Sequence, residues 1–216
     1  EFFNSTPVFT YRKEPLEYSS NQIIKRIFDF TFSLLVCLLI FPWLFLIISI
    51  AIKFSSKGPI FFVQDRSGKD NKRFPCLKFR TMTVNNDSDS VQATKGDARI
   101  TRVGAFLRKT SLDEMPQFIN VLLGHMSVVG PRPHMLKHTE DYGKEINKFM
   151  VRHLVKPGIT GYAQVSGYRG TTETPELMEA RVKHDVFYLE NWTFLFDLKL
   201  IFLTVYNMIK GEENAF

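Results

Sequence analysis

An unbroken run without a charged side chain, Phe30–Ile52, constrains this chain more than any other feature. As one straight α-helix it would be about 34 Å long, enough to cross a hydrocarbon core of about 30 Å. Pro42 stands in the middle, however, and it lacks the backbone N–H that an unbroken helix uses there, which predicts a kink or a break. Each half, Phe30–Phe41 and Trp43–Ile52, would then be about 15–18 Å long and too short to cross alone.

Lysine and arginine side chains flank this apolar block on both sides. They precede it at Arg12, Lys13, Lys25 and Arg26, and they follow it at Lys53, Lys57, Arg66, Lys69, Lys72 and Arg73. Positive charge beside a membrane segment marks the cytoplasmic side. A spanning helix would place one cluster outside, whereas a helix that enters, turns at Pro42 and returns leaves both inside. The charges favour a re-entrant helix–break–helix hairpin, and the residues alone leave a kinked span open.

A second apolar stretch, Thr193–Lys210, is amphipathic at helical spacing. One face carries Leu198, Ile201, Phe202, Val205 and Ile209, and the opposite arc carries Asp197, Lys199, Thr204, Asn207 and Lys210. This pattern is typical of a helix on a membrane surface, and equally of a helix that packs on the core of a soluble domain. The apolar block earlier in the chain favours the interfacial helix.

The other segments predict an α+β fold that is mostly helical and contains one small β-hairpin. Strands are expected at Ile60–Arg66 and Arg73–Met82, on either side of a polar turn. The pattern predicts a polar loop at Val84–Asp97. Helices are expected at Ile100–Lys109, Glu114–Leu123, His134–Phe149 and Pro175–Leu189.

Composition limits the class of protein and the kind of partner. Hydrophobic residues make up 44% and charged residues 23%, which excludes a disordered chain and a polytopic membrane protein. The net charge of +6 favours phosphorylated substrates, acidic lipid or nucleic acid. The two cysteines, Cys37 and Cys76, argue against a disulfide framework or a cysteine zinc site, and the histidines are scattered.

The most distinctive local motif is Ser111-Leu112-Asp113-Glu114-Met115-Pro116-Gln117. Ser111 and Glu114 have the spacing of a capping box, and acidic residues are common in the first turn of any helix. Pro116 fits better if Asp113 is the cap, because its missing N–H then falls in the first turn. Asp113 would then have a low pKa and an ionised carboxylate, as a nucleophile that attacks phosphorus requires. Capping and catalysis both remain open.

Four cationic side chains of a kind that binds phosphate are the second signal: Lys78, Arg80, Arg108 and Arg132. The first two alternate along a predicted strand and therefore point to one face. Arg132 stands between Pro131 and Pro133, which restrict its backbone. The planar guanidinium fork matches phosphate oxygens. A solvated strand face, or pairing of Arg132 with a carboxylate, would explain the same residues structurally.

An acidic pair, phosphate-binding cations and a membrane hairpin together indicate phosphoryl transfer at a bilayer surface. In such chemistry, cations neutralise the phosphate while one group attacks in line. Asp113 and Glu114 also offer the hard oxygen ligands that suit Mg²⁺. A nucleic-acid-binding module is the weaker interpretation, because the cations form no single stripe and nucleic acid would leave the apolar block unexplained.

Several motifs follow one another in an order that resembles a known family. They are Lys25-Arg26-Ile27-Phe28-Asp29, the proline-broken apolar block, Ser56-Lys57-Gly58-Pro59, Gln64-Asp65-Arg66-Ser67-Gly68, Lys78-Phe79-Arg80-Thr81-Met82, the motif at 111–117, Asn120-Val121-Leu122, Gly130-Pro131-Arg132-Pro133 and Pro157-Gly158-Ile159-Thr160-Gly161. The chain resembles the bacterial sugar transferases, monotopic phosphoglycosyl transferases that begin glycan assembly on polyprenol phosphate. The likeness extends from about residue 23 to residue 210.

The resemblance implies a reaction and assigns residues to it. The family moves a hexose-1-phosphate from a UDP-sugar to undecaprenyl phosphate, releases UMP and needs Mg²⁺. Asp113 matches the nucleophile, which forms an aspartyl-phosphosugar intermediate, and Glu114 matches its neighbour, which serves the metal or the proton. Arg132 and Arg108 match residues around the phosphates. The surrounding site is matched by Lys78, Arg80 and Asp185, and Asp29 would lie at the entrance of the hairpin.

The resemblance also implies a layout. Residues 1–22 would be a linker from an N-terminal extension, 23–57 the re-entrant membrane hairpin, and 58–216 a cytoplasmic catalytic domain that ends in the interfacial helix. The expected location is the cytoplasmic face of the bacterial inner membrane, in contact with its lipid. The sugar, the glycan pathway (exopolysaccharide, capsule or O-antigen) and the oligomeric state, a homo-oligomer included, stay open.

Two residues depart from the family pattern. His125 stands where the family usually has aspartate in Gly-Asp-Met-Ser, and Phe41 replaces a serine before the hairpin proline. If that aspartate supports the active-site loop, a catalytically silent membrane scaffold of the same fold becomes the second interpretation. Proline alone breaks a helix, so we expect the turn at Pro42 to persist.

Overall fold

The computed structural model describes residues 13–84, 96–168, 170 and 174–210, together with the paired strands β1 (Phe2–Phe3) and β2 (Thr6–Pro7). The predicted loop at Val84–Asp97 lies mostly outside these residues. The described chain mixes helices with small sheets, as predicted. Its short 3₁₀ turns are η1 (Pro15–Glu17), η2 (Lys69–Asn71), η3 (Leu112–Glu114) and η4 (Phe149–Leu154), and its shortest α-helix is α6 (Tyr162–Val165).

Two consecutive helices carry the apolar block. Helices α1 (Ser19–Leu39) and α2 (Phe41–Ser55) meet at an angle of 61°, and Pro42 lies in the first turn of α2, where its missing N–H leaves no hydrogen bond unmade. The predicted break is therefore confirmed. In the described part of the chain no single helix has the length and hydropathy of a membrane span, whereas the bent pair meets both criteria together.

Ordered structure begins before the predicted end of the linker at residue 22. Leu16 in η1 is buried in the core, and the side chains of Asn21 and Gln22 in α1 donate to the carbonyls of Pro15 and Leu16, at 2.7 and 2.8 Å. These bonds fold residues 15–18 back against the first turn of α1. Residues 15–22 thus form the start of α1 and a turn that packs against it.

The predicted β-hairpin is confirmed. Strands β3 (Phe61–Ser67) and β4 (Arg73–Phe79) pair antiparallel, with Phe61 opposite Phe79 and Ser67 opposite Arg73. The sequence did not predict the pairing of β5 (Ser127–Val129) with β6 (Gly158–Thr160), which is parallel. Three-residue strands are too short to show a periodicity of two.

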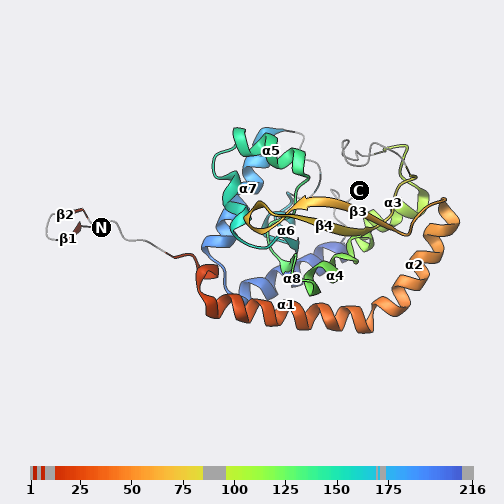
Figure 1. The fold of residues 1–216 in the computed structure, drawn as a ribbon, viewed down its shortest axis with the longest axis horizontal. Coiled ribbons are helices and arrows are strands. Elements are labelled where there is room, and N and C mark those ends of the chain that lie inside the picture. The colour runs from red at the N-terminus through yellow and green to blue at the C-terminus, as the bar shows by residue number, and fades with distance from the viewer. Residues whose placement is uncertain are drawn as a thin grey trace.

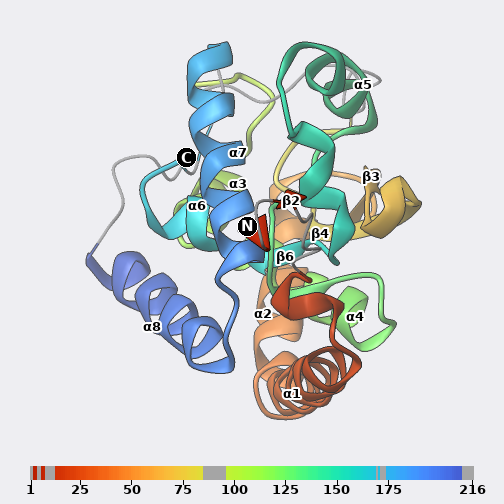
Figure 2. The same ribbon diagram turned by 90° about the vertical axis from the view of Figure 1, so that its left-hand side faces the viewer.

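The remaining predicted helices are present with shifted ends. They are α3 (Arg102–Lys109), α4 (Gln117–Leu122), α5 (Leu136–Glu145), α7 (Pro175–Glu190) and α8 (Phe194–Lys210). Helix α4 begins later than predicted because Pro116 is its N-cap, and the helix predicted at His134–Phe149 is divided between α5 and η4. Two perpendicular views place α1 and α8 along one side of the molecule, below the β3–β4 hairpin and α7 (Figures 1 and 2).

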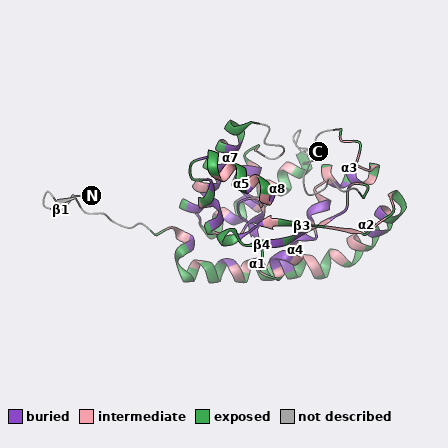
Figure 3. Ribbon diagram, turned by 45° about the horizontal axis from the view of Figure 1, so that its top comes forward, coloured by how far each residue is buried: buried purple, intermediate pink, exposed green. Residues whose placement is uncertain are grey.

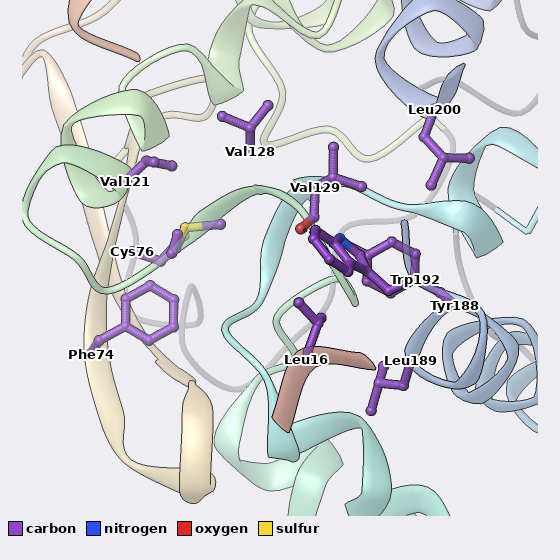
Figure 4. Close-up of a cluster of buried hydrophobic side chains, with 11 residues drawn as sticks. Leu16, Phe74, Cys76, Val121, Val128, Val129, Tyr188, Leu189, Trp192 and Leu200 are labelled. Carbon is purple, nitrogen blue, oxygen red and sulfur yellow. Dashed lines mark hydrogen bonds between the residues drawn. The ribbon is translucent and has the colours of Figure 1, made fainter. Parts of the chain in front are cut away.

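The largest hydrophobic cluster surrounds β5. Val129 is fully buried and lies beside Tyr188, Trp192 and Leu16 (Figure 4). In a second cluster, Ile48 and Ile52 of α2 pack against Phe79 of β4 and Leu107 of α3. The bent pair α1–α2 and the rest of the described chain are therefore packed together.

Helix α1 turns a polar face toward the protein and an apolar face outward, the reverse of helices in a soluble domain. Helix α8 does so in part, because it buries both Asp197 and Leu200. In α1 the buried residues are Lys25, Asp29 and Ser33, whereas side chains such as Leu38 are exposed. In α8 Asp197 is 1% exposed, while Phe202, Val205 and Ile209 of the predicted apolar face are exposed (Figure 3). The predicted apolar face of Thr193–Lys210 thus points mostly outward, although Ile201 packs against the core.

One buried ion pair joins these two helices. Lys25 Nζ lies 2.6 Å from Asp197 Oδ2, and the side chains are 10% and 1% exposed. Asp197 also accepts from Tyr188 Oη at 2.8 Å and from Trp192 Nε1 at 3.0 Å, so its oxygens are satisfied. Asp29, one turn after Lys25, accepts from the backbone N–H of Val128 in β5 at 3.0 Å.

Replacing Lys25 with methionine should destabilise the protein strongly, because it leaves a buried carboxylate without its cation. We expect a loss of about 3–5 kcal/mol in the free energy of unfolding, measured by denaturation in detergent micelles. The matched control is Lys183→Met, which removes an exposed pair with Glu179 whose side chains are 73% and 56% exposed. That control should change stability by less than about 1 kcal/mol, and equal effects of both variants would contradict the prediction.

Candidate active site

The acidic pair lies in a tight turn between α3 and α4. Asp113 and Glu114 belong to η3 and are 8% and 7% exposed. Ser111, which precedes the turn, has a positive φ of 57° and makes no capping hydrogen bond, so the capping-box interpretation is wrong. Asp113 does not cap α4 either, because Pro116 occupies that position. The turn therefore holds two neighbouring carboxylates in the protein interior, where neither serves as a helix cap.

Glu114 is bound by two of the predicted cations. Lys78 Nζ donates to its Oε1 at 2.7 Å, while Arg132 donates through Nη2 to Oε1 at 2.6 Å and through Nη1 to Oε2 at 3.0 Å. Burial alone would raise the pKa of Glu114, but Arg132 and Lys78 hold that pKa well below its usual range. Glu114 is ionised and joins β4 to the loop that follows β5.

Asp113 has a different environment from its neighbour. It accepts no hydrogen bond from another described residue. Burial and the adjacent charge of Glu114 raise the pKa of Asp113 to about 6, against the opposing influence of Lys78, Arg108 and Arg132. The prediction of a low pKa at a helix end is therefore wrong. A carboxylate with a pKa near 6 is largely ionised at neutral pH and more basic than an exposed aspartate, which suits a nucleophile.

Asn120 sets the position of Lys78 relative to the acidic pair. Its Oδ1 accepts from the backbone N–H of Leu77 at 2.9 Å, and its Nδ2 donates to the carbonyl of Pro75 at 2.7 Å. These two bonds attach α4 to β4 beside Lys78. Asn120 belongs to a motif that the sequence singled out, yet its role depends on a contact between distant segments.

A close backbone contact sets the position of Arg108. A Cβ atom on Gly104 would lie 1.9 Å from the carbonyl oxygen of Thr81, so only glycine allows α3 to approach so near to the end of β4. One helical turn later, Arg108 Nε donates to Thr81 Oγ1 at 2.9 Å. Burial lowers the pKa of Arg108 and Asp113 opposes that change, which places the guanidinium in the field of the acidic pair.

Arg80 lies apart from the residues that contact Glu114. Its Nη1 and Nη2 donate to the carbonyls of Lys57 and Ser56, at 2.8 and 2.7 Å, just beyond the end of α2. Lys78 and Arg80 alternate in sequence, but β4 ends at Phe79 and the two side chains reach different partners. In this structure Arg80 binds the backbone that follows α2, the second helix of the bent pair.

The segment Pro131–Pro133 and Asp185 surround the other side of Arg132. The carbonyl of Pro131 accepts from the N–H of Gly158 at 2.9 Å, and that of Pro133 accepts from Arg66 Nη1 at 3.5 Å. Asp185 in α7 forms a buried ion pair at 2.6 Å with Arg152. Asp185 has no contact with the acidic pair among the described residues, so it supports the site from a distance.

Arg152 is a site residue that the sequence did not reveal. It lies in η4 and is 3% exposed, and its Nη2 donates at 3.0 Å to the carbonyl of Arg132. One sequence feature could have indicated it: Arg152 and His153 lie between the apolar residues Val151 and Leu154. A charged residue in an apolar segment is buried only when it has a partner. No periodic pattern identified that partner as Asp185.

The donor set is compatible with Mg²⁺. Among the described residues no group of three or more histidine, cysteine, aspartate or glutamate side chains could hold a metal ion. Mg²⁺ commonly uses one or two carboxylates together with substrate phosphates and water. Among the described residues no hydrogen-bond donor engages the oxygens of Asp113, and its pKa is raised first by burial and then by the charge of Glu114, so a nearby divalent cation would favour its ionised form. Glu114 already binds two cations and offers less to a metal.

His125 lies outside this site. Its side chain is exposed, and its ring centroid is 6.0 Å from that of Phe74. The charges that influence Asp113 come from Glu114, Lys78, Arg108 and Arg132. His125, the residue that suggested a catalytically silent scaffold, therefore takes no part in the described contacts of the acidic pair.

The raised pKa of Asp113 predicts a dependence of stability on pH. Because the pKa is raised from 3.8 to about 6 in the folded protein, folded chains bind this proton more tightly than unfolded ones. Ionisation therefore costs stability as the pH rises from about 4 through 6. Asp113→Asn mimics the protonated side chain, so its advantage in unfolding free energy over wild type should grow across this range. A difference that stays constant with pH would contradict this prediction.

Comparisons with known proteins agree with the geometry. The family model for bacterial sugar transferases matches residues 20–211. The chain is 51% identical to a UDP-glucose:undecaprenyl-phosphate glucose-1-phosphate transferase of Klebsiella pneumoniae, over 99% of this chain and 45% of that protein. It is 42% identical to a transferase of the same name from Caulobacter vibrioides, over 98% of this chain and 79% of that protein.

A relative with a different sugar in its name is also similar. A UDP-N-acetylgalactosamine-undecaprenyl-phosphate N-acetylgalactosaminephosphotransferase of Aeromonas hydrophila is 39% identical over 87% of this chain and 44% of that protein. The chain thus spans less than half the length of some of its curated relatives, in a stretch that holds the acidic pair and the cations around it. On the match across 20–211, the chain belongs to the bacterial sugar transferase family.

Proposed function

We propose that this chain transfers a hexose-1-phosphate from a UDP-sugar to undecaprenyl phosphate and releases UMP. One observation carries the proposal: Asp113 is buried and accepts no hydrogen bond from another described residue, beside Glu114, which binds Lys78 and Arg132. The arrangement combines a nucleophile of raised basicity with cations able to bind phosphate oxygens. The family and the names of its members support transfer of a sugar phosphate to undecaprenyl phosphate. We place this reaction at the first membrane step of exopolysaccharide, capsule or O-antigen synthesis.

The reaction proceeds in two displacements on one phosphorus. In the first, a carboxylate oxygen of Asp113 bonds to the phosphorus that carries the sugar, and the bond from that phosphorus to the oxygen of UMP breaks. UMP leaves with the electron pair, and an aspartyl-phosphosugar remains. In the second, a phosphate oxygen of undecaprenyl phosphate attacks the same phosphorus and the Asp113 carboxylate departs. The lipid diphosphosugar is released and the free carboxylate is restored.

Lys78, Arg108 and Arg132 stabilise the charge that develops on the phosphate oxygens. In the resting site Glu114 holds Lys78 and Arg132 in place, so their orientation is set before the substrate arrives. Glu114 remains ionised because both cations lower its pKa. We therefore assign Glu114 to orienting the cations, with a contribution to metal binding when substrate phosphate shares them.

Mg²⁺ is the cofactor that we propose, held by Asp113 with Glu114 and the phosphates of the donor. When bound, it would neutralise charge on the diphosphate and help to orient the leaving group. Asp113 supplies carboxylate oxygens that no other part of the described chain engages, and burial of the site restricts competing water.

We further propose that the protein lies at the cytoplasmic face of the inner membrane, with α1 and α2 as a re-entrant hairpin and α8 at the interface. Support comes from the outward apolar faces of α1 and α8 and from the bend of 61° between α1 and α2. Water would leave those faces unpartnered, whereas acyl chains would cover them. UDP-glucose is the first donor to test, because several relatives carry glucose in their names.

Purified protein with UDP-glucose, Mg²⁺ and undecaprenyl phosphate should release UMP, and Asp113→Asn should reduce that release to below about 0.1% of wild type. Mass spectrometry of a digest should find a phosphosugar on Asp113 when the lipid acceptor is withheld. The control is Asp141→Asn, an exposed aspartate of α5, which should retain full activity. Normal turnover by Asp113→Asn would exclude it as the nucleophile.

Cysteine labelling should test the hairpin topology. With Cys37 and Cys76 replaced by alanine, single cysteines at the exposed positions Lys13 and Lys69 should react with an impermeant maleimide from the same, cytoplasmic side. Both ends of a re-entrant hairpin return to that side, whereas a spanning helix separates them. Labelling of the two positions from opposite sides of inverted and right-side-out vesicles would overturn the re-entrant assignment.

A further inference from the structure

The backbone that carries Arg132 depends on bonds made from outside its own segment. The flanking prolines have no N–H to donate, so the segment is held largely through its carbonyl oxygens. The carbonyl of Pro131 accepts from a backbone N–H, that of Gly158. The carbonyl of Arg132 itself accepts from a side chain, Arg152 Nη2, at 3.0 Å. The position of the guanidinium that binds Glu114 thus depends on another arginine.

Arg152 is held by a carboxylate from a third segment. Its Nη2 lies 2.6 Å from Asp185 Oδ2, and both side chains are 2% exposed. Burying an ion pair adds little stability compared with well-packed apolar side chains of similar size, because both charges lose their hydration. A pair in this position therefore calls for a function other than stability.

The contacts form a continuous path from α7 to the acidic turn. Asp185 binds Arg152, Arg152 binds the carbonyl of Arg132, and the guanidinium of Arg132 binds Glu114 through both of its terminal nitrogens. Asp113 directly precedes Glu114 in η3. We propose that Arg152, held by Asp185, is a positioning residue that fixes the phosphate-binding fork of Arg132. This inference rests on the proposed function and adds a residue to its site.

Arg152 acts through Arg132 and does not touch the reacting groups. Among the described residues it has no contact with Asp113 or Glu114. Its charge is matched by Asp185, so its direct contribution to the field at the acidic pair is small compared with that of Arg132. The hydrogen bond to the carbonyl remains as the means by which it influences the site.

A double-mutant cycle separates positioning from general stabilisation. Arg152→Met is made in wild type and in Arg132→Lys, which lacks the fork. In wild type we expect the value of kcat/KM for UDP-glucose to fall about 10- to 100-fold, mainly through a higher KM. In Arg132→Lys the same change should cost less than about 3-fold, because no fork remains to be oriented. Equal losses in both backgrounds would overturn the proposal.

Two further variants guard against unfolding as the cause. Arg152→Met with Asp185→Leu replaces the pair by apolar side chains and should remain folded, yet it should show the same loss of kcat/KM. Arg26→Met is the matched control: this half-buried arginine also donates to backbone carbonyls, those of Val121 at 2.6 Å and Leu122 at 2.9 Å. Its effect should be the same in both backgrounds, and coupling as large as that of Arg152 would overturn the assignment.

The same double-mutant cycle can be measured without turnover, by determining the affinity of each variant for UDP by calorimetry. If wild type binds UDP but releases no UMP from any UDP-sugar, the proposed function fails while the coupling between Arg152 and Arg132 is still measured. Coupling of about 10-fold or more in UDP affinity would then sustain the positioning role. Additive effects on UDP affinity, or a wild type that neither binds UDP nor turns over, would overturn it.

Discussion

The binding of Glu114 by Lys78 and Arg132 is the interaction on which the arrangement of the site depends. It joins β4, the turn at η3 and the loop after β5, which are far apart in the sequence. Without it, two adjacent buried carboxylates would repel each other and lose much of their hydration. With it, one carboxylate is neutralised, whereas burial and Glu114 keep the pKa of the other, Asp113, raised to about 6.

The proposed membrane elements and the site share strand β5. Asp29 of α1 accepts from the N–H of Val128, and Tyr188 donates both to the carbonyl of Val129 and to Asp197 of α8. Strand β5 leads directly into the segment that carries Arg132. The polar faces of α1 and α8 therefore support the strand beside the site while their apolar faces point outward. The charged residues Asp29 and Asp197 are therefore buried in α1 and α8 because they hold the polypeptide around β5.

The sequence predicted what depends on local patterns. The break at Pro42, the β3–β4 hairpin and the face of α8 follow from proline chemistry, alternation and helical spacing. The motif order identified Asp113, Lys78 and Arg132 as a group. The pKa of Asp113 was predicted in the wrong direction, because burial and Glu114 outweigh any helix end. Arg152, the place of Arg80 and the β5–β6 pairing depend on tertiary contacts, which leave no periodic trace in the sequence.

The close contact between Gly104 and Thr81 couples the orientation of α3 to the position of Arg108. Because backbone meets backbone there, no rotation of a side chain can absorb a change, and a methyl group at position 104 would tilt the whole helix. The tilt would move Arg108 at the next turn away from Thr81 Oγ1. A substitution at Gly104, which contacts neither the substrate nor the acidic pair, would thus displace Arg108 in the proposed phosphate-binding region, because the helix between them is rigid.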